Sequence, residues 1–239
     1  MFPTMSCSFI GRLLDTIARR RCCVCRRPLA ASEQYLCTEC NYLYPRTDYL
    51  SRPYDNPLAQ VYWGRVRCVE RAAAFAYHYA HSESAHPIYQ LKYFSRPQLG
   101  IALGRLFGQE MVSSGFSQGI DLMMPIPLAA SRLKQRGYNQ SLMLARGLSA
   151  ATGIPVDDTF LARTQFAGSQ TQRNRWQRVE NVKDTFVLRS PSGLTGKHIL
   201  LVDDVVTSGA TSCACANALE KAHPAAISIS CLAFVDPEH

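Results

Sequence analysis

The stretch "KHILLVDDVVTSGATSCACANAL", from Lys197 to Leu219, decides the fold. It begins as a continuous hydrophobic strand and ends that strand in two adjacent carboxylates, Asp203 and Asp204, which we expect to be exposed acceptors. A turn rich in Thr, Ser and Gly follows and opens a helix. Ligands of open α/β sheets bind beyond the carboxyl ends of the strands, so this segment predicts a ligand site.

The turn from Thr207 to Thr211 has the composition of a phosphate site. Its backbone N–H groups, the positive end of the helix dipole and three hydroxyls can surround a phosphate dianion, and Gly209 permits a positive φ. The carboxylates repel phosphate, so they suit neighbouring hydroxyls, such as a vicinal diol, or a divalent metal. A phosphate beside a diol describes a ribose 5-phosphate. The structural alternative is an Asp pair that only caps a helix.

The rest of the chain alternates between strands and helices. Helices are predicted to begin at Pro87, at Pro97 and after Asn139, which can cap the third of them; the second should end at Gly115. Hydrophobic strands that alternate with helices indicate a parallel sheet with helices on both faces. The predicted strands are 71–80, 121–128, 158–163, 197–204 and 225–235.

Four of the ten cysteines form two Cys-x₂-Cys pairs, Cys22 with Cys25 and Cys37 with Cys40, separated by eleven residues. Each pair aims two thiolates at one tetrahedral cation, and two pairs close a Cys₄ shell, which predicts a structural zinc site. Redox dithiols and incidental buried cysteines are the alternatives. We assign no role to Cys7, Cys23, Cys68, Cys213, Cys215 and Cys231.

The prolines between residues 44 and 57 interrupt any regular element, so a domain boundary is expected there. Residues 1–57 would comprise an amphipathic helix at 8–20, the Cys₄ module and a linker, and residues 58–239 the α/β domain. The helix docks on its own protein or lies on a membrane surface. No run reaches the roughly 18 apolar residues of a membrane span, and Arg12 interrupts the amino-terminal apolar positions. We therefore expect a cytoplasmic protein that is not an integral membrane protein.

The net charge of +8 is concentrated in two patches. Residues 1–27 hold six arginines against one aspartate, and residues 126–180 hold eight Lys and Arg against three acids. These patches favour polyanionic partners, either a small phosphate ligand or nucleic acid, although solvated surface arginines are the alternative. Trp176 lies among the arginines of the second patch, where it stacks on bases or packs on the core. The candidate nucleic-acid contacts are Arg19, Arg20, Arg21, Arg173, Arg175 and Arg178.

Four motifs carry a family resemblance. The segment "ILLVDDVVTSGAT" resembles the phosphoribosyl-pyrophosphate (PRPP) loop of the type I phosphoribosyltransferases. "PIPLAASRLKQRGYNQS" (125–141), "RTQFAGSQTQRNRWQRVENVKDTF" (163–186) and "YQLKYFSRPQLG" are similar to the ComF/GntX family of competence and DNA-utilisation proteins, whose members also carry an amino-terminal cysteine module. The resemblance covers nearly the whole chain and implies a type I phosphoribosyltransferase-like domain.

The resemblance also implies roles for particular residues. Asp203 and Asp204 would hold the ribose hydroxyls, and Mg²⁺ would accompany PRPP. Cations that follow the 121–128 strand would meet pyrophosphate oxygens, unless they are ordinary surface charge at the start of a helix; these are Arg132, Lys134 and Arg136. The 5-phosphate would be wrapped by Thr207, Ser208, Gly209, Ala210 and Thr211.

Two functions follow. The resemblance implies a ComF-type protein of natural transformation that binds PRPP or a related ribose phosphate, and single-stranded DNA through its zinc module and basic patches. Competence or DNA-processing proteins would be its partners. The alternative is a Mg-dependent phosphoribosyltransferase that acts on an amine or base, for which residues 61–95 and 163–186 would form the hood without readable specificity.

Overall fold

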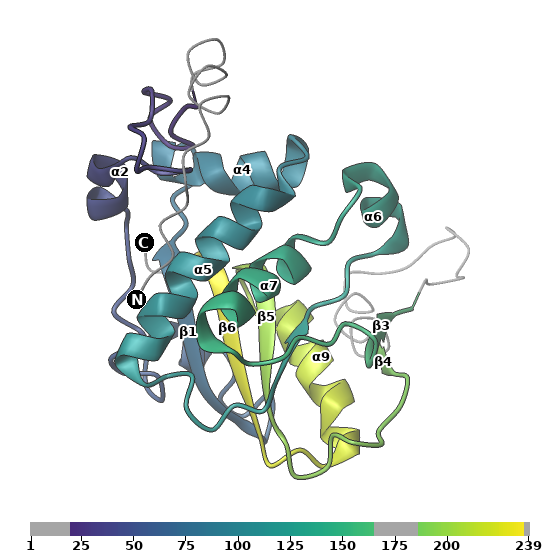
Figure 1. Ribbon diagram of the computed structural model, residues 1–239. Helices are drawn as coiled ribbons and strands as arrows, with labels where there is room; N and C mark the ends of the chain where they lie inside the picture. The colour runs from purple at the N-terminus through teal and green to yellow at the C-terminus, as the bar shows by residue number, and fades with distance from the viewer. Residues whose placement is uncertain (1–19, 165–185, 237–239) are drawn as a thin grey trace.

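The computed structural model describes residues 20–164 and 186–236. Its centre is a parallel four-stranded sheet (Figure 1). The sheet order is β1 (Val69–Tyr77), β6 (Ala226–Phe234), β5 (His198–Val206) and β2 (Leu122–Pro125). β5 pairs with β6 on one side and with β2 on the other, so it is a central strand. The predicted parallel sheet is confirmed, but the predicted strand at 158–163 is not part of it.

Helices cover both faces of this sheet. The connection from β1 to β2 runs through α4 (His86–Tyr93) and α5 (Pro97–Ser114), and α7 (Gln140–Thr152) then leads to Val156, which bridges β2 in parallel. The connection from β5 to β6 runs through α9 (Ala210–Leu219) in the opposite direction. Because parallel crossovers are right-handed, α5 and α7 lie on one face and α9 on the other. Figure 1 shows α5 and α7 side by side over the sheet.

α5 and α7 pack with their backbones in close contact. A Cβ at Gly104 would lie 2.2 Å from the carbonyl oxygen of Leu144, and one at Gly147 would lie 2.1 Å from that of Ile101. Only glycine allows this approach. α5 ends at Gly115 in the left-handed region, as predicted. Asn139 caps α7, also as predicted, and donates to the carbonyl of Ile126 at 3.0 Å. The start of α7 is thereby fixed to the end of β2.

The segment from 44 to 57 lies along the free edge of β1. Backbone hydrogen bonds join Thr47 to Phe75 and Ala72 to Pro53, and the side chain of Tyr49 is fully buried. The segment leads into the short helix α3 (Pro57–Gln60). The predicted linker is therefore an ordered strap on the sheet edge, and the domain boundary at residue 57 stays a prediction.

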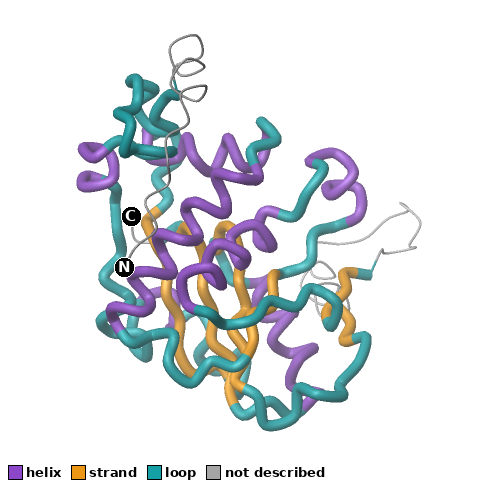
Figure 2. Tube along the Cα trace, in the orientation of Figure 1, coloured by secondary structure: helices purple, strands orange, loops and turns teal. Residues whose placement is uncertain are grey.

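The cysteine module packs against α4. Its short helix is α2 (Thr38–Leu43), and the rest is mostly loop (Figure 2). The amide of Gln90 donates to the carbonyl of Cys23 at 2.6 Å, and a ring nitrogen of His86 lies 3.0 Å from the carbonyl oxygen of Val24.

The remaining elements are η1 (Glu83–Ala85), α6 (Ala130–Arg136), the antiparallel pair β3 (Leu161–Arg163) and β4 (Phe186–Leu188), and η2 (Glu220–Ala222).

Almost all of the predicted helix at 8–20 falls outside the described residues. Among the residues that are described, no helix combines the length and the apolar character required to cross a membrane.

Candidate phosphoribosyl site and cysteine cluster

Asp203 lies in the interior of the protein, at the carboxyl end of the central strand β5. Its exposed fraction is 8%, so the expectation that both acids are exposed is wrong for this residue. β5 continues to Val206, and the first turn of α7 covers the carboxyl, which accepts a hydrogen bond from the hydroxyl of Ser141 at 3.3 Å. The backbone N–H of Asp204 also donates to it, at 2.8 Å.

Burial raises the pKa of Asp203 from its usual 3.8 to about 8, and the neighbouring charge of Asp204 adds to this effect. A carboxyl that keeps its proton near neutral pH can donate as well as accept a hydrogen bond. Asp204 is more accessible, and its carboxylate lies 3.5 Å from the ammonium of Lys92, on α4. The two neighbouring acids therefore present different groups to a ligand.

The turn from 207 to 209 links β5 to α9. Gly209 has φ of 69° and is the N-cap of α9, where no side chain caps the helix. A Cβ at this position would also lie 2.3 Å from a methyl carbon of Val61, so glycine is required by both conformation and space. Arg65 supports the turn by donating to the carbonyl of Ser208 at 2.8 Å. The first N–H groups of α9 have no intrahelical acceptor, which suits an anion.

A pocket of about 160 Å³ brings both acids and Thr211 together with several cations, whereas Thr207, Ser208, Gly209 and Ala210 are not among its lining residues. Arg132 and Arg136, from α6, line it, whereas Lys134 is not among its lining residues. Arg136 is oriented by a 2.9 Å hydrogen bond to the side chain of Gln140. The other polar residues that line the pocket are Lys92, Gln140, Ser141, Arg163, Asp203, Asp204 and Thr211. Two acids, which can accept hydrogen bonds from hydroxyls, and several cations, which can bind phosphate oxygens, therefore line one small pocket.

The four predicted cysteines cluster in space. The Sγ atoms of Cys22, Cys25, Cys37 and Cys40 all lie within 4.8 Å of one another, and those of Cys25 and Cys37 are 3.8 Å apart. Four sulfurs bound to one tetrahedral zinc, at about 2.3 Å each, would be about 3.8 Å apart. Backbone N–H groups donate to the sulfurs of Cys22 and Cys37, at 3.4 Å each, which favours thiolates. The cluster can therefore hold a metal ion.

Comparison with known proteins agrees with this geometry. The phosphoribosyl transferase domain family matches residues 138–239. DNA utilization protein YhgH of Escherichia coli K12 is 30% identical over 219 residues, which cover 88% of this chain and 95% of that protein. Competence protein F of Haemophilus influenzae is 33% identical over 92 residues, or 38% of this chain and 40% of the other. The chain belongs to the ComF family.

The domain match and the parallel sheet confirm the expected type I phosphoribosyltransferase-like fold of this ComF-family protein. Among solved structures, the glutamine PRPP amidotransferase from B. subtilis, complexed with ADP and GMP, is 21% identical and gives a TM-score of 0.42. That likeness covers 60% of this chain and 30% of the other.

Four polar residues of the ComF-family pocket were not expected from the sequence. Lys92 lies in the quoted segment "YQLKYFSRPQLG", Gln140 and Ser141 follow the capping Asn139, and Arg163 ends the short strand β3. None of these positions carries a local sequence signal, because each role depends on contacts with segments that are distant along the chain. Ser141, for example, bonds to a carboxyl 62 positions later.

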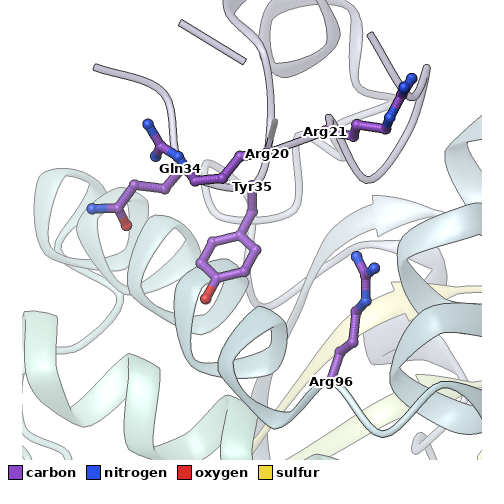
Figure 3. A pocket seen from close by; sticks show the side chains of 5 residues that line it. All are labelled: Arg20, Arg21, Gln34, Tyr35 and Arg96. Carbon is purple, nitrogen blue, oxygen red and sulfur yellow. The ribbon is translucent and has the colours of Figure 1, made fainter. Parts of the chain in front are cut away.

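Of the nucleic-acid candidates, only Arg20 and Arg21 are described, whereas Arg19, Arg173, Arg175 and Arg178 lie outside the described residues. Arg20 donates to the carbonyl of Glu33 at 2.8 Å. Both arginines line a cavity of about 630 Å³ between the cysteine module and the turn after α4. Figure 3 shows its lining residues, which also include Gln34, Tyr35 and Arg96.

Proposed function

We propose that this ComF-family protein binds PRPP, or a related ribose phosphate, at the end of β5 and single-stranded DNA through its cysteine module and basic patches. The observation that carries the proposal is the small pocket in which Asp203, Asp204 and Thr211 lie opposite the arginines of α6. The names of the relatives, a DNA utilization protein and a competence protein, support a role in DNA uptake or use during natural transformation.

In the proposed complex, Asp203 and Asp204 contact the two ribose hydroxyls. The turn from Thr207 to Thr211 binds the 5-phosphate with backbone N–H groups and hydroxyls, a chemistry that needs no formal positive charge. Arg132 and Arg136 bind the pyrophosphate oxygens, for which planar guanidinium groups are well suited. Lys134 is left out of this assignment because it is absent from the pocket lining.

Two metals belong to the proposal. The four cysteines would hold a structural zinc with no open coordination position. Bound Mg²⁺ would neutralise part of the pyrophosphate charge, and the carboxylates of the pocket are oxygen donors of the kind that it prefers. We also propose a cytoplasmic location, since the five described cysteines outside the cluster are free thiols and thiols stay reduced there.

Calorimetric titration with PRPP and Mg²⁺ tests the ligand assignment. The Asp203→Asn/Asp204→Asn double variant should lose at least about tenfold in affinity, because the charged acceptor lost at Asp204 alone is worth about 1.5–3 kcal/mol. Asp157→Asn/Asp158→Asn removes an adjacent acid pair that does not line the pocket, and it should bind like the wild type. Equal affinity of the wild type and the Asp203/Asp204 variant would refute the assignment.

Phosphoribosyl transfer to an amine or base is the second candidate function. The raised pKa of Asp203 favours it, because a carboxyl that titrates near neutral pH can act as a general acid or base. Incubation with radiolabelled PRPP, Mg²⁺ and a mixture of amines and nucleobases separates the two functions. Release of pyrophosphate that depends on an acceptor identifies an enzyme, whereas binding without release identifies a ligand-binding adaptor.

A further inference from the structure

Two aromatic rings are exposed side by side in the chain where α4 ends. Tyr93 is 65% exposed and Phe94 is 67% exposed. Ser95 follows in the left-handed region, with φ of 48°, a conformation that is unfavourable for a residue with a Cβ. The turn that exposes the two rings is therefore strained at Ser95. Strained turns are frequent at binding sites.

Arg96 connects this turn to the cysteine module. Its guanidinium donates to the side chain of Gln90 at 2.8 Å, and Gln90 in turn donates to the carbonyl of Cys23. Arg96 therefore helps to form the cavity of about 630 Å³ that the module contributes to. Figure 3 shows the side chain of Arg96 extending toward the module and the ring of Tyr35 extending toward α4 and α5.

On its other side, the turn adjoins the phosphoribosyl pocket. The guanidinium of Arg136, which lines that pocket, lies 5.9 Å from the centre of the Tyr93 ring. Lys92, the residue before Tyr93, forms the ion pair with Asp204. Tyr89 stacks beside Tyr93, with 6.4 Å between ring centres and 25° between ring planes. The exposed rings therefore lie between two groups of cations that belong to different sites.

Alternation of aromatic rings and cations is the arrangement by which proteins bind single-stranded nucleic acid: bases stack on the rings and phosphates contact the cations. The lining residues of the larger cavity include three arginines and no acidic residue in the described part of the chain. This excess of positive charge favours a polyanion over a neutral protein surface, and the aromatic rings favour nucleic acid among polyanions.

We infer that a single strand of nucleic acid binds from the cavity of the cysteine module, across Tyr93 and Phe94, to the phosphoribosyl pocket. Its phosphates contact Arg20, Arg21 and Arg96, and its bases stack on Tyr35, Tyr93 and Phe94. The inference rests on the DNA-binding part of the proposed function and goes beyond it by naming the aromatic contacts. It also brings one end of the strand next to the ribose-phosphate ligand.

Fluorescence anisotropy with a labelled oligothymidylate 12-mer tests this path on the full-length, metal-loaded protein. Tyr93→Ala/Phe94→Ala should weaken binding at least about tenfold, because stacking on an aromatic ring contributes several-fold per base. Tyr54→Ala is the matched control: its ring is also exposed but lies beside the amino-terminal part of β1, and its affinity should equal that of the wild type.

The salt dependence provides an independent readout. Arg96→Gln should reduce the slope of log affinity against log salt by about one. Arg105→Gln, which removes an exposed arginine of α5, should leave the slope unchanged. In addition, an oligonucleotide that carries 5-iododeoxyuridine should photocrosslink to Tyr93 or Phe94 and not to Tyr54.

The outcomes separate the inference from the proposed function. If the wild type binds the oligonucleotide and the Tyr93/Phe94 variant binds equally well, the path is wrong and the DNA-binding function stands. If the wild type does not bind the oligonucleotide at low salt, both are overturned. Unchanged metal content and melting temperature of each variant exclude misfolding as the cause of a loss.

Discussion

The chemistry of the proposed ligand site depends most on how single residues are buried. Asp203 occupies the interior of the central strand, and its carboxyl is covered by Ser141 and shares its surroundings with Asp204. A buried acid is ordinarily disfavoured in its charged form. Its burial in β5 is therefore expected to cost stability, and the proposed ligand site gives the acid pair a role that stability alone does not.

This placement predicts a pH-dependent stability. Since the pKa of folded Asp203 is about 8, against 3.8 ordinarily, the folded state retains a proton that the unfolded state releases. The free energy of unfolding is thus greatest below the ordinary pKa, decreases as the pH rises toward 8, and then levels off. Asp203→Asn keeps the acceptor oxygen and removes the titration.

Thermal melts of both proteins measure the effect. At about pH 8, Asp203→Asn should melt roughly 5 °C above the wild type, and at about pH 5 the difference should shrink. Ser141→Ala, which keeps the carboxyl, should still show the wild-type dependence on pH. A difference in melting temperature that is the same at both pH values would contradict the burial argument.

Gly209 is the second residue on which the site depends. Gly209→Ala should lower stability by about 2–4 kcal/mol, because it adds left-handed strain and a collision with Val61. Gly119→Ala isolates the strain, since its φ is 74° and its Cβ would meet open space. Denaturant unfolding should show a larger loss at Gly209, and Val61→Ala should recover the difference. Equal losses at the two glycines would be inconsistent with the close approach.

At this scale the sequence predicts what is local. The acid pair, the capping role of Asn139 and the stop at Gly115 follow from short motifs, and the last two are present in the structure. Burial of Asp203 does not follow, because it depends on the start of α7 reaching across to β5. The pairing of Lys92 with Asp204 cannot be predicted from the sequence for the same reason, because the two residues are far apart along the chain.

At the scale of elements, α4 joins the two sites of the molecule. One part of the helix holds the cysteine module through His86 and Gln90, and its last turn presents Lys92 to Asp204. The carbonyl of Leu91 accepts hydrogen bonds from Tyr138 and Gln140, which flank the start of α7. A single short helix thus fixes the cysteine module, the rings of the proposed strand path and a pocket cation.

Lys92→Met tests the functional part of this arrangement. Removal of the ammonium should lower the calorimetric affinity for Mg²⁺ and PRPP about tenfold. It should also lower the free energy of unfolding by about 1–3 kcal/mol, because the side chains of this ion pair are only 23% and 18% exposed and Asp204 loses its partner. Lys197→Met breaks an ion pair of the same 3.5 Å length, with Asp121, at the opposite end of the sheet. Its PRPP affinity should match the wild type. A loss of the same size in both variants would show that Lys92 has no specific role.

The sequence pattern predicts every long helix and core strand of the described domain, from hydrophobic runs for the strands and from start signals and helical spacing for the helices. It does not predict how α5 and α7 meet. The hydrophobic positions of α5 indicate a core-facing stripe, whereas the contact with α7 is made by Gly104 against the backbone of Leu144. A glycine in a helix sequence can indicate either flexibility or close packing of another backbone. Only the position of the partner helix distinguishes the two.

At the scale of the whole molecule, a cysteine module is docked on an α/β domain whose pocket opens nearby. The cluster of four sulfurs predicts one zinc per chain, measurable by atomic emission on the purified protein. Cys37→Ser should lose the metal, while Cys23→Ala should retain it because Cys23 is outside the cluster. Zinc retained by Cys37→Ser, or lost by Cys23→Ala, would contradict the proposed ligand set.

The central claim is that a ribose phosphate binds where β5 meets α9. The most direct test is a crystal structure of the protein grown with PRPP and Mg²⁺. The account predicts the 5-phosphate against the backbone N–H groups of residues 207–211 and the ribose hydroxyls within hydrogen-bond distance of Asp203 and Asp204. Density for the ligand anywhere else, with this pocket closed by its own side chains, would contradict it.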